Sequence, residues 1–360
     1  MNSPGGWAKA LVKLFVISAP VSLLTLAACQ SSPAEFNLQY ACLQPNLPPC
    51  LLAEEFAARV ADRTDGRVRI EITSIPDLLG REIDEVPRLE DGTLEMAEIY
   101  AAHFFGDGDR AVLDILDLWG LYPDFGTQEQ VTEAIRKEIE GIIAKRSRGL
   151  VLAVQFYPSN YLFSRRPLRT VADIQGLRIR SHNTLSDDLL DGMGAIAEHV
   201  TFDSVSPNLQ SGNLGAAISC SSCGVGLRWY YVAAYLVGPI PALGHSWITI
   251  NGKIWSELPP DIQLIIREEA KRHEVATKEA SLARWDQRGV QKNLSEGMVH
   301  IELTPELKEL MLTASLTTVL PNWVRRAGGP NSKPVMVFNE KVAPIVKVAI
   351  SQDGTAKEIY

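Results

Sequence analysis

Two spacings of apolar residues follow one another along this chain, and together they predict an α/β protein. Alternation predicts strands near residues 36–40, 68–72 and 94–100, and a short apolar run predicts a buried strand over 150–156. Apolar residues at helical spacing separate these segments, as expected when helices connect the strands of one sheet.

The longest helical pattern covers residues 259–296, with no internal proline or glycine before Gly289. A pattern of this length predicts one long helix. Capping residues predict the starts of three others: Thr127 with Gln130, Thr184 with Asp187, and Ser206 before Pro207.

Arg180 closes a turn-and-strand segment, residues 173–180, in which Leu177 and Ile179 point to one face and Arg178 and Arg180 to the other. Open α/β sheets bind ligands at the carboxyl ends of their strands. A guanidinium group there is shaped to bind a carboxylate. The alternative is a surface arginine paired with a neighbouring acid.

Composition and motifs argue against several classes of function. A chain of 360 residues favours two domains, and a net charge of −8 argues against nucleic-acid binding. The sequence has no nucleophile elbow with a Ser-His-Asp order, no paired-carboxylate motif and no phosphate loop, so an enzyme is not expected and no cofactor is implied. Its six histidines are scattered, without the spacing of a metal site.

The N-terminus predicts export. Lys9 and Lys13 precede an apolar run, residues 14–28, that is too short to span a bilayer with ease. Leu26-Ala27-Ala28-Cys29 matches a bacterial lipoprotein cleavage box, which predicts a signal peptide over 1–28, lipidation of Cys29 and a tether over 29–35. We therefore expect a periplasmic protein that contacts a membrane only through its lipid anchor. The alternative is an ordinary secretory signal in which Cys29 is incidental.

Four cysteines remain: Cys42, Cys50, Cys220 and Cys223. In an oxidising compartment an even number suggests disulfides, and four cysteines allow three pairings. Cys220-Ser221-Ser222-Cys223 has the spacing of a thioredoxin motif but lacks its sequence context, so redox catalysis is disfavoured.

Several short blocks, in order and spacing, resemble the solute-binding receptors of tripartite ATP-independent periplasmic (TRAP) transporters, the dicarboxylate-receptor family. The resemblance extends from about Phe56 to Ile345. The blocks are Phe56–Val60 with Arg63–Val68, Leu79-Gly80, Leu89–Met96, Asp173–Arg180, Leu209–Gly212, Ile250-Asn251 and Trp255–Gln263.

The resemblance implies a two-lobe, periplasmic-binding-protein-like α/β fold with a central cleft and a long helix crossing both lobes. It implies capture of a small monocarboxylate or dicarboxylate and its delivery to the membrane subunits of a TRAP transporter. A receptor that signals to a membrane kinase would use the same fold. The expected limits are lobe I over 36–157 with 246–290 returning to it, lobe II over 158–245 with 291–345 returning to it, the crossing helix over 259–296 and a tail over 346–360.

In that family the arginine at the position of Arg180 forms a salt bridge to the ligand carboxylate. Three places depart from the family. Asn160 stands where sugar-acid receptors have a second arginine, and Ser219 or Cys220 where many members have an asparagine. Trp229-Tyr230-Tyr231 is an aromatic cluster that either lines an apolar pocket or packs the lobe. Further candidates, each either a ligand contact or a core or rim residue, are Phe156, Tyr157, Asn160, Ser219, Cys220, Glu98, Tyr100, Gln39 and Trp229. Tyr231, two residues after Trp229, is expected to pack inside its lobe.

Family topology brings the loops after Cys42 and Cys220 near the ligand. A bridge between these two would join the lobes and oppose opening of the cleft. Two local disulfides are therefore expected, Cys42 with Cys50 and Cys220 with Cys223.

Overall fold

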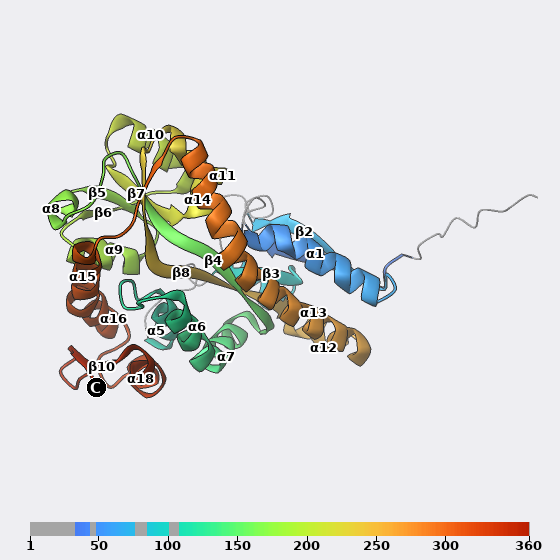
Figure 1. Ribbon diagram of the computed structural model, residues 1–360. Helices are drawn as coiled ribbons and strands as arrows, with labels where there is room; N and C mark the ends of the chain where they lie inside the picture. The colour runs from blue at the N-terminus through green and yellow to red at the C-terminus, as the bar shows by residue number, and fades with distance from the viewer. Residues whose placement is uncertain (1–32, 44–47, 76–84, 101–107, 360) are drawn as a thin grey trace, which may run out of the picture. The chain divides into compact units, whose positions relative to one another are not determined.

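A computed structural model describes residues 33–43, 48–75, 85–100 and 108–359, in which helices surround a mixed β-sheet (Figure 1). The strands are β1 (Phe36–Cys42), β2 (Val68–Ser74), β3 (Met96–Tyr100), β4 (Gly149–Ser164), β5 (Arg178–Ser181), β6 (Ile196–His199), β7 (Ala216–Cys220), β8 (Tyr235–Asn251) and β9 (Val299–Ile301). Within the described residues they form one sheet in the order β2-β1-β3-β8-β4-β7-β5-β6, with β9 also paired to β8. The predicted α/β class is confirmed.

The two longest strands, β4 and β8, connect two halves of this sheet. Residues 149–156 of β4 pair with 245–251 of β8 beside β3, whereas residues 159–164 pair with 235–243 and with β7. The predicted strand over 150–156 is therefore only the first half of β4.

Tyr157 and Asn160, expected in a loop after that strand, lie inside β4. The register between β4 and β8 shifts between Phe156 and Ser159, so that Tyr157 and Pro158 have no paired residue there. A bulge of this kind accommodates a proline, which has no N–H to donate, and it bends the strand. Pro158 therefore lies inside one long, irregular strand.

The helices pack on both faces of the sheet. They are α1 (Pro48–Arg63), α3 (Val86–Asp91), α5 (Ala111–Asp114), α6 (Phe125–Ala134), α7 (Arg136–Ser147), α8 (Val171–Ile174), α9 (Thr184–Gly192), α10 (Phe202–Ser211), α11 (Ser221–Gly226), α12 (Gly252–Glu257), α13 (Pro260–Glu279), α14 (Asp286–Ser295), α15 (Pro305–Ala314), α16 (Leu320–Arg326), α17 (Lys333–Val337) and α18 (Ala343–Val346). Short helical turns include η2 (Ile115–Asp117) and η3 (Trp229–Tyr231). In the tail, β10 (Val348–Ile350) pairs with β11 (Ala356–Glu358).

The predicted long helix is confirmed as a continuous helical segment from Pro260 to Ser295. At its beginning Glu269 of α13 accepts hydrogen bonds from Arg59 at 2.7 Å and Arg63 at 2.9 Å, which ties it to α1. At its end the side chain of Asn293 donates to the carbonyl of Ser221 in α11 at 3.0 Å. The helix therefore contacts elements on both halves of the sheet, as Figure 1 shows.

A π-helical turn, η4 (Ala280–Trp285), interrupts this helix between α13 and α14. The Ser281 hydroxyl donates to the carbonyl of Phe156, the residue at which the β4 register breaks. The irregular turn of the helix and the irregular part of the sheet are thus in contact. π-Turns recur at functional positions in helices.

Three helices begin further upstream than their sequences predict: α9 after Asn183, α10 after Thr201 and α6 after Asp124. Asn183 Oδ1 accepts from Ser186 N at 2.8 Å, so asparagine, not Thr184, caps α9. Pro207, expected at a first turn, lies inside α10.

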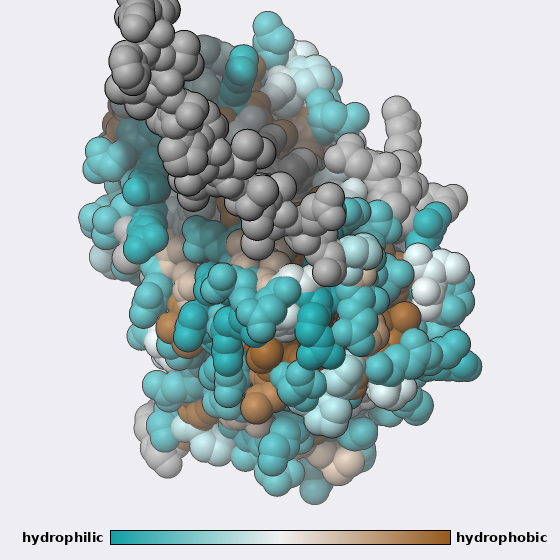
Figure 2. All heavy atoms as spheres, turned by 90° about the vertical axis from the view of Figure 1, so that its right-hand side faces the viewer, coloured by the Kyte–Doolittle hydropathy of each residue, from teal (hydrophilic) through white to brown (hydrophobic). Residues whose placement is uncertain are grey.

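The face that Figure 2 shows is mainly hydrophilic, with small apolar areas between the polar side chains. The described part of the chain contains no helix long and apolar enough to cross a membrane. The predicted signal peptide over 1–28 and the lipidation site Cys29 lie outside the described residues.

Candidate functional site: a buried guanidinium at a strand end

Arg180 lies at the carboxyl end of β5, where the sequence predicts it, and only 3% of its surface is exposed. Two backbone carbonyls hold the guanidinium: Nη1 donates to Ile218 at 2.8 Å and Nε donates to Val200 at 3.2 Å. The ring of Phe202 lies 4.6 Å from the guanidinium carbon. Carbonyl oxygens and aromatic faces attract a cation, so these contacts orient the side chain.

No carboxylate neutralises this group among the described residues, where Arg180 has no ion pair and donates only to the two carbonyls. Burial lowers the pKa of Arg180 to about 10 because the charged form has lost its water. Arg178, in the same strand, is exposed and ion-paired with Glu198. Buried charges are normally paired, so Arg180 departs from the usual pattern within the described residues.

Glu98, Tyr157 and Tyr100 form a second group of predicted residues that the structure brings together. The fully buried Glu98 carboxylate accepts from the hydroxyls of Tyr157 and Ser246, both at 2.5 Å, and from Leu43 N at 2.7 Å. Burial raises the pKa of Glu98, although these hydrogen bonds lower it in part. With its oxygens used in this way, Glu98 positions Tyr157.

Tyr100 links the two groups. Its ring meets the ring of Tyr157 edge-on at 5.5 Å between centroids. Burial raises the pKa of Tyr100. The negative charges of Asp117 and Glu98 raise this pKa further, and the positive charge of Arg180 lowers it. Arg180 therefore lies within electrostatic range of the Tyr100 hydroxyl.

Asn160, Ser219 and Cys220 lie together where β4 and β7 pair. Asn160 is opposite Cys220, Ser219 is opposite Tyr161, and Asn160 Nδ2 donates to the Ala242 carbonyl at 2.6 Å. Cys220 is two residues beyond Ile218, whose carbonyl holds Arg180. Ser219, Cys220 and Arg180 therefore lie at the ends of the neighbouring strands β7 and β5, and Asn160 lies beside Cys220 inside β4.

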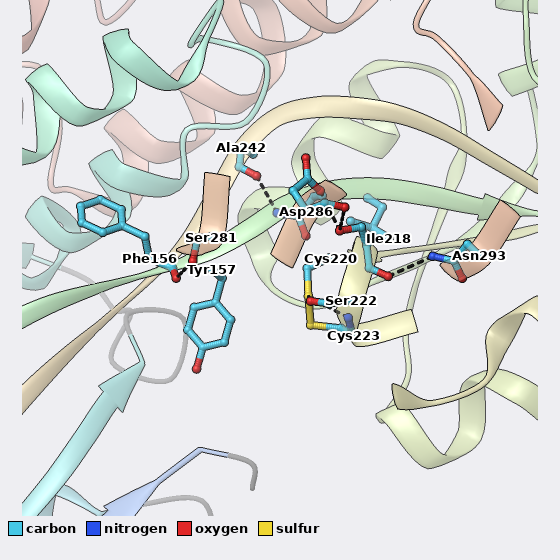
Figure 3. Close-up of a disulfide and its surroundings, with 12 residues drawn as sticks. Phe156, Tyr157, Ile218, Cys220, Ser222, Cys223, Ala242, Ser281, Asp286 and Asn293 are labelled. Carbon is cyan, nitrogen blue, oxygen red and sulfur yellow. Dashed lines mark hydrogen bonds between the residues drawn. A yellow bond between two sulfur atoms is a disulfide. The ribbon is translucent and has the colours of Figure 1, made fainter. Parts of the chain in front are cut away.

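Phe156 is not brought to this group by any described contact. In Figure 3 its ring points away from that of its neighbour Tyr157, as alternation along a strand requires. It packs edge-on against Phe125 at 5.9 Å and His245 at 5.2 Å.

Gln39 and Trp229 also lie apart. Gln39 is half-buried in the middle of β1, and its backbone N–H donates to Glu95 at 3.0 Å. Trp229 is fully buried and packs on Phe163 and on Phe202, so it supports the ring that lies against Arg180. The expectation that Tyr231 packs is wrong, since 72% of it is exposed.

Both local disulfides are confirmed, Cys42 with Cys50 and Cys220 with Cys223. Figure 3 shows the second beside Ser222, at the start of α11. Within the described ranges no group of three His, Cys, Asp or Glu side chains is arranged to hold a metal ion.

Three contributors to the site were missed from sequence: Phe202, Asp117 and Asn183. Asp117 Oδ2 accepts from Asn183 Nδ2 at 2.9 Å, across 66 positions of sequence. Nothing in the segment around Asp117 marks it as special, because its partner is brought to it only by folding.

Comparison with known proteins agrees with this architecture. The model of a family described as bacterial extracellular solute-binding protein, family 7, matches residues 42–321. A curated solute-binding protein of Roseobacter denitrificans is 24% identical over 226 residues, which cover 61% of this chain and 67% of that protein.

Solved structures are similar over nearly their whole length. DctP7, a Bordetella pertussis extracytoplasmic solute receptor binding pyroglutamic acid, is 18% identical with a TM-score of 0.74, over 86% of this chain and 99% of its own. A TRAP periplasmic solute-binding protein from Desulfovibrio salexigens with bound orotic acid is 21% identical with a TM-score of 0.74, over 86% of this chain and 99% of its own. Another TRAP periplasmic solute-binding protein, from Desulfovibrio desulfuricans with bound sn-glycerol-3-phosphate, is 18% identical with a TM-score of 0.72, over 86% of this chain and 97% of its own. These similarities establish the fold and confirm the predicted two-lobe class.

Proposed function

We propose that this chain, which belongs to the bacterial extracellular solute-binding proteins of family 7, is a TRAP-type receptor that captures a small organic acid whose carboxylate pairs with Arg180. It delivers this ligand to the membrane subunits of a TRAP transporter. Its relatives are receptors, a class without catalytic activity. The signalling alternative has no observation in its favour.

One observation carries the proposal: Arg180 is buried, held in direction by two carbonyls, and lacks an anion among the described residues. A carboxylate that enters this site replaces the lost water of the guanidinium with a charge-assisted hydrogen bond. The fold places the guanidinium at strand ends, where α/β proteins bind ligands.

The ligands of similar structures support an anion. Pyroglutamic acid and orotic acid are carboxylic acids, whereas sn-glycerol-3-phosphate offers a phosphate. The planar fork of an arginine suits both groups, and we choose the carboxylate because the proteins with the highest TM-scores cited above hold carboxylic acids.

The predicted lobe limits place Arg180 in lobe II, with Tyr100 and Tyr157 in lobe I. In the proposed complex the two tyrosines approach the ligand from the side opposite Arg180. Ser219 and Cys220 flank it from the end of β7, Asn160 flanks it from inside β4, and the lipid on Cys29 keeps the receptor at the membrane.

Replacement of Arg180 tests the proposal, with thermal shift used to find a carboxylate ligand and calorimetry to measure it. Arg180→Met should weaken binding by about 2–4 kcal/mol, or about 30- to 1000-fold, because the ligand carboxylate would be left buried and unpaired. Arg178→Met is the matched control, since Arg178 is exposed and paired with Glu198 in the same strand. It should bind as wild type does.

The stability of the ligand-free variant separates a binding role from a structural one. Removal of an unpaired buried charge should leave Arg180→Met at least as stable as wild type. A large loss of stability together with less than a threefold change in affinity would mean that Arg180 is structural.

A further inference from the structure

A carboxylate lies close to the strand end that carries Arg180. Asp117 ends η2, and the segment after it packs against the loop that joins β5 to α9. Asp117 Oδ2 accepts from Asn183 Nδ2 at 2.9 Å, and the ring of Trp119 meets that of His182 at 5.2 Å. Asn183 follows Arg180 by three residues, so these contacts hold Asp117 beside the proposed carboxylate site.

Asp117 has no cationic partner in the described part of the chain. Its side chain is buried, with 6% of the residue exposed, and its hydrogen bond from Asn183 uses only one oxygen. Oδ1 has no partner among the described residues. Burial raises the pKa of Asp117 to about 7, although the Asn183 hydrogen bond lowers it in part.

The structure thus holds two buried groups of opposite charge that do not pair with each other. Both act on the pKa of Tyr100, which Asp117 raises and Arg180 lowers. They therefore lie within electrostatic range of the same hydroxyl. A ligand between them would meet a fixed donor on one side and an acceptor on the other.

The direction of the acceptor is set by Asn183. The side-chain oxygen of Asn183 caps α9 by accepting from Ser186 N at 2.8 Å, which turns its amide nitrogen toward Asp117. Asp117 Oδ2 is committed to that nitrogen, and Oδ1 is left to accept from something else. A preorganised acceptor of this kind favours a ligand with a matching donor.

We propose that Asp117 accepts a hydrogen bond from an N–H group of the ligand, so that the ligand is a small carboxylate that also carries an amide, lactam, imide or ammonium N–H. This inference rests on the proposed function of Arg180. A dicarboxylate would place its second negative charge toward a buried carboxylate and should bind less well.

Paired probes test the inference. In pyroglutamate a lactam N–H lies beside the carbon that carries the carboxylate, and 5-oxotetrahydrofuran-2-carboxylate has a ring oxygen in its place. Proline and tetrahydrofuran-2-carboxylate form a second pair, and succinate represents dicarboxylates. Calorimetry on wild type should show that the N–H member of the tighter-binding pair is favoured by about 10- to 100-fold, as for a hydrogen bond to a charged group.

The variant Asp117→Asn should reduce that preference below about threefold. Because Asn183 Nδ2 requires an acceptor, the oxygen of the new amide would turn to it and leave an NH₂ group facing the ligand. Asp188→Asn is the matched control, since Asp188 is also buried but is already bonded to Asn322 and Arg326. It should keep the wild-type preference.

The outcomes separate the two proposals. If carboxylates bind and Arg180→Met abolishes binding, but each pair binds equally or succinate binds best, only the role of Asp117 is refuted. If no carboxylate in the panel binds wild type, the proposed function of Arg180 fails and the present inference fails with it. An unchanged N–H preference in a folded Asp117→Asn protein would also refute the role of Asp117.

Discussion

His273 and Asp117 should make the stability of this protein depend on pH in opposite directions. His273 lies on α13 with no exposed surface, its Nε2 is 2.6 Å from Gln155 Oε1, and its ring packs on Phe56. Burial lowers the pKa of His273 from 6.5 to about 4. The ring therefore stays neutral in the folded protein where it would be protonated in the unfolded chain.

The sign for His273 follows from this difference. As the pH falls from about 6.5 to about 4, the unfolded chain takes up a proton that the folded protein refuses, so stability is lost toward acid. Over this interval the free energy of unfolding falls by about 3 kcal/mol, at about 1.4 kcal/mol for each tenfold change in proton concentration.

Asp117 works the other way because its pKa is raised, from 3.8 to about 7. Its contribution to stability is complete below the unfolded pKa and is lost as the pH rises through about 7. The loss amounts to about 4 kcal/mol, so the two contributions largely cancel in wild type between pH 4 and 7.

Urea unfolding between pH 4.5 and 8 of wild type, His273→Gln and Asp117→Asn separates the two effects. The stability of His273→Gln relative to wild type should rise toward acid, and that of Asp117→Asn should rise toward alkali. Packing losses do not depend on pH, so they displace each curve without changing its slope, and the double variant should have nearly the wild-type slope. Three parallel curves would refute the assignment of both groups as buried and perturbed.

Three other predictions concern the cysteines and the helix behind them. The double change Cys220→Ala with Cys223→Ala should weaken ligand binding several-fold in calorimetry while shifting the melting temperature little. A disulfide that closes so short a loop stabilises the fold by less than the roughly 3 kcal/mol expected for a fifteen-residue loop. A large loss of stability with unchanged affinity would contradict this prediction. Gly289→Ala should destabilise by about 1–3 kcal/mol in urea, because its Cβ would lie 2.6 Å from Ser222 N, whereas Gly141→Ala, with open space around its Cβ, should not. Cys29→Ser should lose acyl mass and leave the membrane fraction, and an unmodified wild-type chain that begins elsewhere would refute lipidation.

Sequence reasoning succeeded where one local signal decided the structure. The helix from Pro260 to Ser295 was predictable because its apolar spacing is uninterrupted, and Arg180 because a strand with alternating faces ends beside it. The start of α9 was misplaced by one residue because Asn183 and Thr184 are both able to cap a helix, and only the hydrogen bond to Ser186 distinguishes them.

It failed where the decisive partner is distant or is part of the backbone. Carbonyls of Val200 and Ile218 hold Arg180, and a carbonyl gives no signal in the side-chain pattern. The predicted strand over 150–156 was too short because its apolar run ends there, whereas β4 continues past Pro158 through a register shift. Asp117 was missed because its environment is created by Asn183 and by burial.

The buried groups of Arg180 and Asp117 also explain how the proposed site gains affinity for its ligand. In a protein without ligand, Arg180 and Asp117 are both buried and neither has an ionic partner among the described residues. Above about pH 7, where Asp117 is ionised, each therefore carries a desolvation cost that folding leaves uncompensated. A ligand with a carboxylate and an N–H group would offset both costs in one step, whereas a ligand with only one of these groups would leave the other charge unpaired. Selectivity would then arise from the costs already present in the free protein, more than from the number of contacts made on binding.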